Sequence, residues 1–217
     1  YQACLSHGVQ PIIGADCWVK GSDGFGRLTL IAMNQEGYKN LLELLSLGWL
    51  KGQEGDYALL EWEWIAEHSA GIICLTGATE GEIGRLVAVG QIDKADAVLD
   101  KYHAVFADRL YFELTRVGLS GETALAHYAV QSADQRLIPL VATNVACFQE
   151  ADDFEAHETR VCIHDSVTLD DQRRLHRHTP EQWLKSQDAM AELFFDLPDA
   201  VANTVQIAKR CGVELTL

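Results

Sequence analysis

Histidine and cysteine side chains are the first candidates for metal chemistry in this sequence. His157 and His164 lie seven residues apart, a spacing that places both on one face of an α-helix. With Cys147 or Cys162 they would supply the nitrogen and sulfur donors that zinc binds. The short ligand spacings typical of structural zinc sites are missing, so we favour isolated side chains over a zinc site.

A second pair, His176 and His178, is separated by one residue and would suit a metal by spacing alone. It lies in the arginine-rich stretch 173–178, and Asp170 and Asp171 are the carboxylates nearby. Such a stretch is more typical of a solvated loop than of a metal site.

Other catalytic patterns are missing from the sequence. It contains no G-x-S-x-G elbow, no Walker A motif and no glycine-rich dinucleotide fingerprint. Residues 21–26 are glycine-rich, but they read as a turn between two strands. The acidic pairs 152–153 and 170–171 are typical of helix caps or solvated turns. From its own chemistry, the chain is an α/β domain without a recognisable active site.

The elements that would position these side chains alternate along the first 150 residues. Apolar runs predict strands at 11–19, 28–33, 71–75, 110–114 and 138–143. Helical spacing predicts helices at 36–51, 62–67, 80–89, 91–106 and 121–135. The apolar face of the first long helix is expected to comprise Tyr38, Leu41, Leu42, Leu45 and Trp49. Continuous apolar strands between helices predict a mainly parallel sheet or a barrel, covered on its outside.

From residue 151 onward the pattern is helical. Helix starts are predicted from capping residues or a first-turn proline at Asp152 or Asp153, Thr179, Ser186 and Pro198. The first of these helices is expected to reach Ile163, and the last to end near Cys211, before Gly212.

Composition limits the class of protein. The 217 residues suffice for one large domain or two small ones, and the net charge of −15 indicates a surface that repels phosphate backbones. No apolar run approaches the ~20 residues of a membrane span. Six scattered cysteines predict free, mostly buried thiols in a reducing cytoplasm. Because the chain lacks an initiator Met, we expect it to begin inside a longer polypeptide.

The order of several short segments carries a resemblance to a known family. The segments are Gly14-Ala15-Asp16, Leu75-Thr76-Gly77, Phe112-Glu113-Leu114 and Val141-Ala142-Thr143-Asn144, followed by residues 153–171 and 193–211. In this order they resemble the PHP domain of bacterial DNA polymerase III alpha subunits, over essentially the whole chain. The resemblance implies an α/β fold: a partial, distorted PHP-type (β/α)7 barrel followed by an all-helical C-terminal segment.

The same resemblance implies how the chain is organised. Residues 1–150 would form the partial barrel, and residues 151–217 would complete the domain and lead to the polymerase palm. The family's first strands, with a His-x-His motif, would precede Tyr1. The palm carboxylates that bind Mg²⁺ would follow Leu217, and the whole protein would synthesise DNA.

Active members of this family hold a metal cluster and hydrolyse phosphoesters, so the corresponding positions can be examined singly. Asp16 keeps a carboxylate. Ala78 stands where the family has Cys, Val117 where it has His, and Val145 and Cys147 where it has the Asp and His of an Asp-x-His motif. Four of these five positions have lost the family's ligand, so we predict a vestigial site at Asp16. No metal cluster, no cofactor and no hydrolysis are expected in this chain.

A domain that keeps its fold without this chemistry is expected to have a structural role. The resemblance implies as partners the polymerase palm, the proofreading exonuclease and other replicase subunits, with DNA bound mainly by the whole protein in the cytoplasm. Two alternatives stay open: a PHP phosphoesterase or exonuclease active in its own right, and the error-prone paralogue of the alpha subunit.

Overall fold

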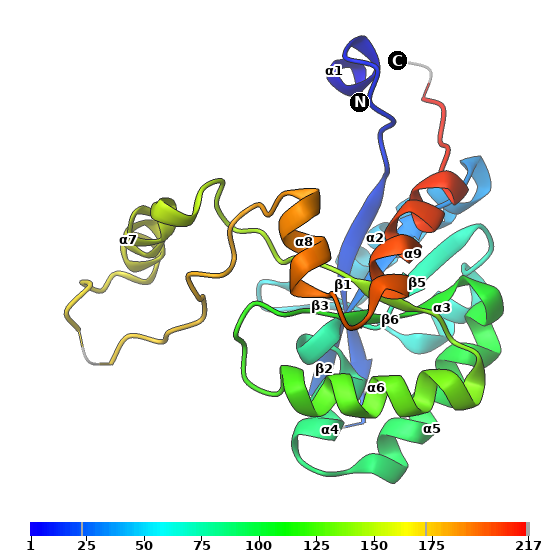
Figure 1. Cartoon of the computed structure of the whole chain (residues 1–217). Coiled ribbons are helices and arrows are strands. Elements are labelled where there is room, and N and C mark those ends of the chain that lie inside the picture. The colour runs from blue at the N-terminus through cyan, green and yellow to red at the C-terminus, as the bar shows by residue number, and fades with distance from the viewer. Residues whose placement is uncertain (23, 172, 216–217) are drawn as a thin grey trace.

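The computed structural model describes residues 1–22, 24–171 and 173–215, and its strands form one mixed sheet (Figure 1). The strands are β1 (Gly14–Gly21), β2 (Gly24–Ala32), β3 (Gln53–Glu54), β4 (Tyr57–Leu60), β5 (Ile72–Leu75), β6 (Leu110–Leu114) and β7 (Leu140–Ala142). The helices are α1 (Gln2–Ser6), α2 (Gln35–Lys51), α3 (Trp62–Glu67), α4 (Glu82–Ala88), α5 (Ile92–Phe106), α6 (Glu122–Arg136), α7 (Phe154–Asp165), α8 (Gln187–Leu193) and α9 (Pro198–Arg210). Short 3₁₀ turns are η1 (Ala78–Glu80), η2 (Ala107–Arg109) and η3 (Ala151–Asp153).

The strand order β3-β4-β1-β2-β5-β6-β7 combines two kinds of pairing. Strands β5, β6 and β7 run parallel, as the helices between them require, and β1 pairs in parallel with β4. The β1–β2 hairpin, predicted from its glycine-rich turn, is antiparallel, and so are β2–β5 and β3–β4. Within the described ranges the outer strands β3 and β7 do not pair, so the sheet is an open, partial barrel. The predicted α/β class is thereby confirmed. The small β3–β4 ribbon was not predicted from the sequence.

The apolar strands are continuous because both faces of the sheet are covered. On β5, Ile72 and Cys74 pack into the main core with helices α2 and α4–α6, whereas Ile73 and Leu75 point to the other face. There they meet Ile207 of α9. A strand buried on both faces loses the alternation of apolar and polar residues, which explains the unbroken run at 71–75.

Helix α2 has the predicted length but a different buried face. Leu41 is buried as predicted, whereas Leu42 and Trp49 are 46% and 55% exposed. Gly37 lies on the buried face instead, so close to the sheet that a Cβ there would overlap the carbonyl oxygen of Gly71. Because glycine lets the helix approach the neighbouring backbone, the face chosen by packing differs from the face with the largest apolar side chains.

The C-terminal helices follow the sequence signals only in part. The Ser186 hydroxyl accepts a hydrogen bond from the Ala189 amide and caps α8, and Pro198 occupies the first turn of α9, both as predicted. The helix start at Thr179 is wrong. The Gln182 side chain does accept a hydrogen bond from the Thr179 amide. A turn and extended chain nevertheless follow, because residues 182–184 form backbone hydrogen bonds with the loop at Phe148.

Candidate functional site

A buried arginine lies where three carboxylates converge, one of them the predicted site residue Asp16. Asp16 on β1 and Arg27 on the neighbouring strand β2 are joined by a 3.2 Å ion pair. The Arg27 side chain is only 10% exposed, and it also reaches Glu80 of η1 at 3.3 Å and Glu113 of β6 at 3.7 Å. One guanidinium thus contacts carboxylates from three separate parts of the chain.

Glu113 is the buried member of this group. Its carboxylate accepts hydrogen bonds from the Gly77 amide at 3.0 Å and the Thr143 hydroxyl at 2.7 Å. Burial raises the pKa of Glu113 above its ordinary value, and the Arg27 charge and these hydrogen bonds act in the opposite direction. Neither Arg27 nor Glu113 was among the predicted site residues. The available signals were a charged residue inside the predicted strand 110–114 and an arginine directly before the predicted strand 28–33.

Asp16, the one predicted site residue that kept its carboxylate, is 56% exposed, but its carboxylate already has partners. Its second oxygen accepts a 2.5 Å hydrogen bond from the Thr29 hydroxyl, directly opposite in the β1–β2 register. Both carboxylate oxygens therefore have partners within the sheet, one a hydroxyl and one a guanidinium.

The metal cluster of active relatives does not fit this site. A cavity of about 430 Å³ opens beside Arg27 and is lined by Ala78, Val145 and Cys147, three of the positions compared with family ligands. The fourth, Val117, is fully buried. Aliphatic side chains cannot bind a cation, and a fixed guanidinium beside Asp16 opposes a second positive charge there.

Gly77, shortly after the end of β5, provides the backbone amide that hydrogen-bonds to Glu113. Its backbone adopts φ +81°, in the left-handed region, and its amide points at the Glu113 carboxylate. A Cβ on this residue would overlap the backbone oxygen of Arg27. Both the conformation and the close approach therefore require glycine.

Replacing Gly77 by Ala is expected to lower the free energy of unfolding by about 2–4 kcal/mol, because left-handed strain of about 1–3 kcal/mol adds to the overlap. Gly90→Ala is the matched control: φ is +74°, but nothing lies within 4 Å of its Cβ position. Urea unfolding of both variants separates the two contributions. An equal loss in both would show that the contact at Gly77 relaxes freely.

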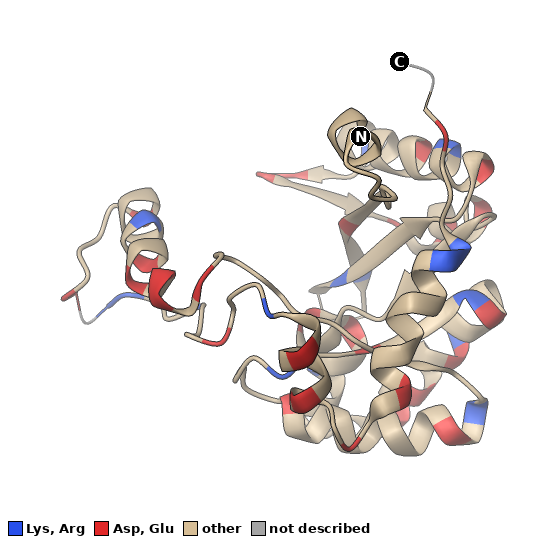
Figure 2. Ribbon diagram, turned by 45° about the horizontal axis from the view of Figure 1, so that its top comes forward, with Lys and Arg blue, Asp and Glu red and all other residues tan. Residues whose placement is uncertain are grey.

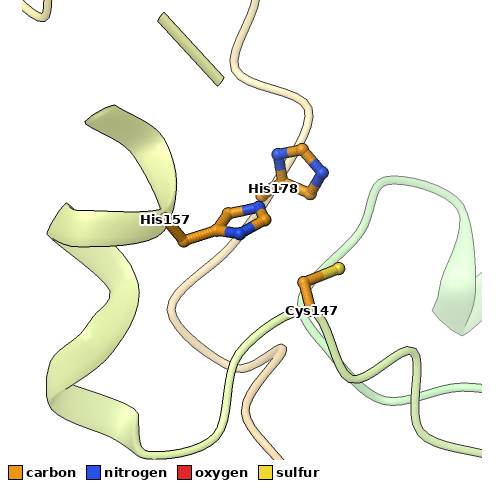
Figure 3. A group of neighbouring side chains, drawn as sticks. All are labelled: Cys147, His157 and His178. Carbon is orange, nitrogen blue, oxygen red and sulfur yellow. The ribbon is translucent and has the colours of Figure 1, made fainter. Parts of the chain in front are cut away.

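The histidines and cysteines group differently from the sequence hypotheses. Cys147, His157 and His178 come together, with one donor atom from each lying within 4.8 Å of the others (Figure 3). His164 and His176 are exposed and lie outside this group. Each histidine pair considered from the sequence therefore contributes one member to this group, His157 from the first pair and His178 from the second.

The environment of this group is partly buried. Burial lowers the pKa of His157, and nearby His178 and Arg160 act in the same direction. Burial also raises the pKa of the Cys147 thiol, with Glu80 adding to the effect. Four of the other cysteines, Cys17, Cys74, Cys162 and Cys211, are buried free thiols, as predicted.

The arginine-rich stretch after α7 is neutralised by carboxylates. Arg174 binds Glu158 at 2.8 Å, Arg173 binds Asp171 at 2.8 Å, and Arg177 lies 3.2 Å from Asp165. Figure 2 shows basic and acidic positions close together on the arm that carries α7. The stretch is therefore no free basic surface of the kind that binds nucleic-acid backbones.

An open seven-stranded mixed sheet, covered by helices on both faces, defines an α/β domain of the partial-barrel type. The family model for the PHP domain matches residues 1–117, more than half of the chain. The chain therefore belongs to the PHP domain family.

Its curated relatives are much longer proteins. The chain is 45% identical to the DNA polymerase III subunit alpha of Pseudomonas fluorescens and 46% identical to that of Pseudomonas aeruginosa, each over 220 residues. It is 40% identical to the subunit of Escherichia coli K12 over 221 residues. In each case all of this chain aligns, but it spans only 19% of the relative. Among the described residues, no helix has both the length and the apolarity needed to cross a membrane.

Proposed function

We propose that this chain is a structural PHP domain within a cytoplasmic replicative DNA polymerase, and that it has no phosphoesterase activity of its own. The observation that carries the proposal is the Arg27 guanidinium, held among Asp16, Glu80 and Glu113. A permanent cation built into the sheet supplies the neutralisation that a metal cluster would otherwise supply, but it cannot activate water.

Alignment of the whole chain with polymerase alpha subunits supports the wider part of the proposal. The complete protein would then extend a primer on a DNA template, with Mg²⁺ bound by palm carboxylates outside this chain. The domain would stabilise the palm and dock the proofreading exonuclease among the other replicase subunits. The net charge of −15 and the neutralised arginine stretch favour protein contacts over a DNA grip here.

The rival function is a metal-dependent phosphoesterase acting at Asp16. To separate the two, the natural full-length protein and its Asp16→Ala variant would be assayed for primer extension and for hydrolysis of a phosphomonoester with added Mn²⁺ or Zn²⁺. We expect primer extension by both and no hydrolysis that depends on Asp16. Metal-stimulated turnover that Asp16→Ala abolishes would establish the rival function.

The docking role has its own test. The proofreading exonuclease should bind the full-length protein in a titration by calorimetry, and a version lacking residues 1–217 should not bind it. Equal binding by both proteins would place the docking surface elsewhere.

A further inference from the structure

We propose that Cys147, His157 and His178 bind a single zinc ion, which fastens the arm carrying α7 to the edge of the sheet. This site borders the cavity beside Arg27 and shares Cys147 with the positions compared above, but its two histidines come from other segments and it does not depend on the polymerase assignment. Its ligands come from three segments: the loop after β7, helix α7 and the returning chain before Thr179 (Figure 3).

The donors suit zinc in kind and in placement. One thiol sulfur and two imidazole nitrogens form a mixed set typical of Zn²⁺, which binds sulfur at about 2.3 Å and nitrogen at about 2.0–2.1 Å. The three donor atoms already lie within 4.8 Å of one another. Because a tetrahedral zinc needs separations of about 3.5 Å between donors, small side-chain rotations suffice. The fourth position is left to water, since Cys147 and His178 line the cavity beside Arg27.

Unsatisfied polar atoms in the group provide an independent indication. Both ring nitrogens of His157 are buried without a hydrogen-bond partner. Buried polar atoms are nearly always paired, and a bound ion is one of the few explanations for an unpaired buried imidazole. Phe148 lies against the His157 ring, with 5.4 Å between ring centroids, so an apolar side chain rather than solvent borders one donor.

A carboxylate stands behind one of the proposed ligands. Glu158 Oε1 lies 3.3 Å from Nδ1 of His178, and this carboxylate is itself held by Arg174. Metal-binding histidines usually direct their second nitrogen to a carboxylate, which orients the ring and strengthens the donor. With Nδ1 directed to Glu158, Nε2 of His178 is the nitrogen left for zinc.

The position of the site explains what the ion would do. Helix α7 stands apart from the rest of the molecule (Figure 1). The chain leaves the sheet at Phe148 and, after α7, comes back beside it, where Phe148 and Trp183 form a β-bridge. A zinc ion joining both ends of this excursion would close the loop 148–177 and order the arm. Metal sites that close long loops stabilise the folded protein by reducing the conformational entropy of the unfolded chain.

The test uses the natural full-length protein, stripped with a chelator and titrated with Zn²⁺ or Co²⁺. We expect Cys147→Ser to retain one zinc fewer per chain than the unaltered protein. We also expect Co²⁺ to give a thiolate-to-cobalt absorption band that Cys147→Ser removes. His157→Gln and His178→Gln should each weaken zinc binding by about a hundredfold or more.

Matched controls lie close by. His164→Gln, on the same helix but exposed, Cys4→Ser and Asp16→Ala should each leave zinc content and the cobalt band unchanged. Limited proteolysis supplies a readout that needs no variant: zinc should slow cleavage within residues 148–181 of the unaltered protein at least fivefold.

The proposal is overturned if Cys147→Ser keeps the same zinc content, if the cobalt band survives that substitution, or if Asp16→Ala removes the metal. Loss of zinc with Asp16→Ala would point to a cluster at the mouth, which would contradict the proposed function as well. Loss with Cys147→Ser alone supports this inference and leaves the polymerase assignment untouched.

Discussion

Replacing Arg27 by Met is expected to lower the free energy of unfolding by about 3–5 kcal/mol near neutral pH. The substitution leaves Glu113, whose side chain is 5% exposed, charged in the interior without its cation. Removing one partner of a buried ion pair is far more costly than removing both. Urea unfolding followed by circular dichroism would measure the loss.

The pH dependence of this loss has a definite sign. The pKa of Glu113 is raised in the folded state, and loss of Arg27 raises it further, so the folded state takes up a proton more readily than the unfolded state. Lowering the pH toward the ordinary carboxyl value should therefore return stability to Arg27→Met. The penalty should reappear as pH rises through the folded-state pKa.

Two comparisons make the Arg27 result interpretable. The double variant Arg27→Met with Glu113→Gln removes both charges and should recover most of the lost stability. Arg173→Met removes an arginine that is 88% exposed, and its effect should stay within about 0.5 kcal/mol. A double variant no more stable than Arg27→Met alone would mean that the cost comes from lost packing and not from an unpaired charge.

Truncating Phe194 to Ala is expected to cost about 3–5 kcal/mol, the range for a fully buried aromatic side chain. Phe194 ends α8 and is 0% exposed within the main core, with the Arg116 guanidinium 4.7 Å from its ring centroid. Its neighbour Phe195 is 79% exposed. Phe195→Ala is therefore a control that matches in residue type and position, and it should change stability by less than about 0.5 kcal/mol.

Phe194→Ala also tests the predicted organisation into residues 1–150 and a segment 151–217 that completes the domain. The test is made in a Trp183→Phe background, because the other four tryptophans all lie within residues 1–150. If both parts unfold together, Phe194→Ala shifts one transition, seen alike by circular dichroism and by tryptophan fluorescence. If the segment unfolds on its own, the tryptophan signal keeps its midpoint while part of the helical signal is lost earlier. That second outcome would contradict a single domain.

Local chemistry made much of the fold predictable. The bounds of α3 and β6 match the predicted ranges, and the cap at Ser186 and the proline at Pro198 mark helix starts as expected. These features depend on interactions within a few residues, which a single sequence displays directly. Failures occur where distant segments compete: Thr179 has the residues of a helix start, but pairing with the loop at Phe148 holds the chain extended.

The candidate site shows the same division more sharply. The sequence by itself determined that aliphatic residues stand at Ala78, Val117 and Val145, because residue type alone decides that they cannot bind a metal. Only the tertiary structure decided that Arg27 neutralises the remaining carboxylates, and that His157 and His178 meet. Such contacts join residues far apart in the chain, and packing sets their geometry without leaving a local pattern to read.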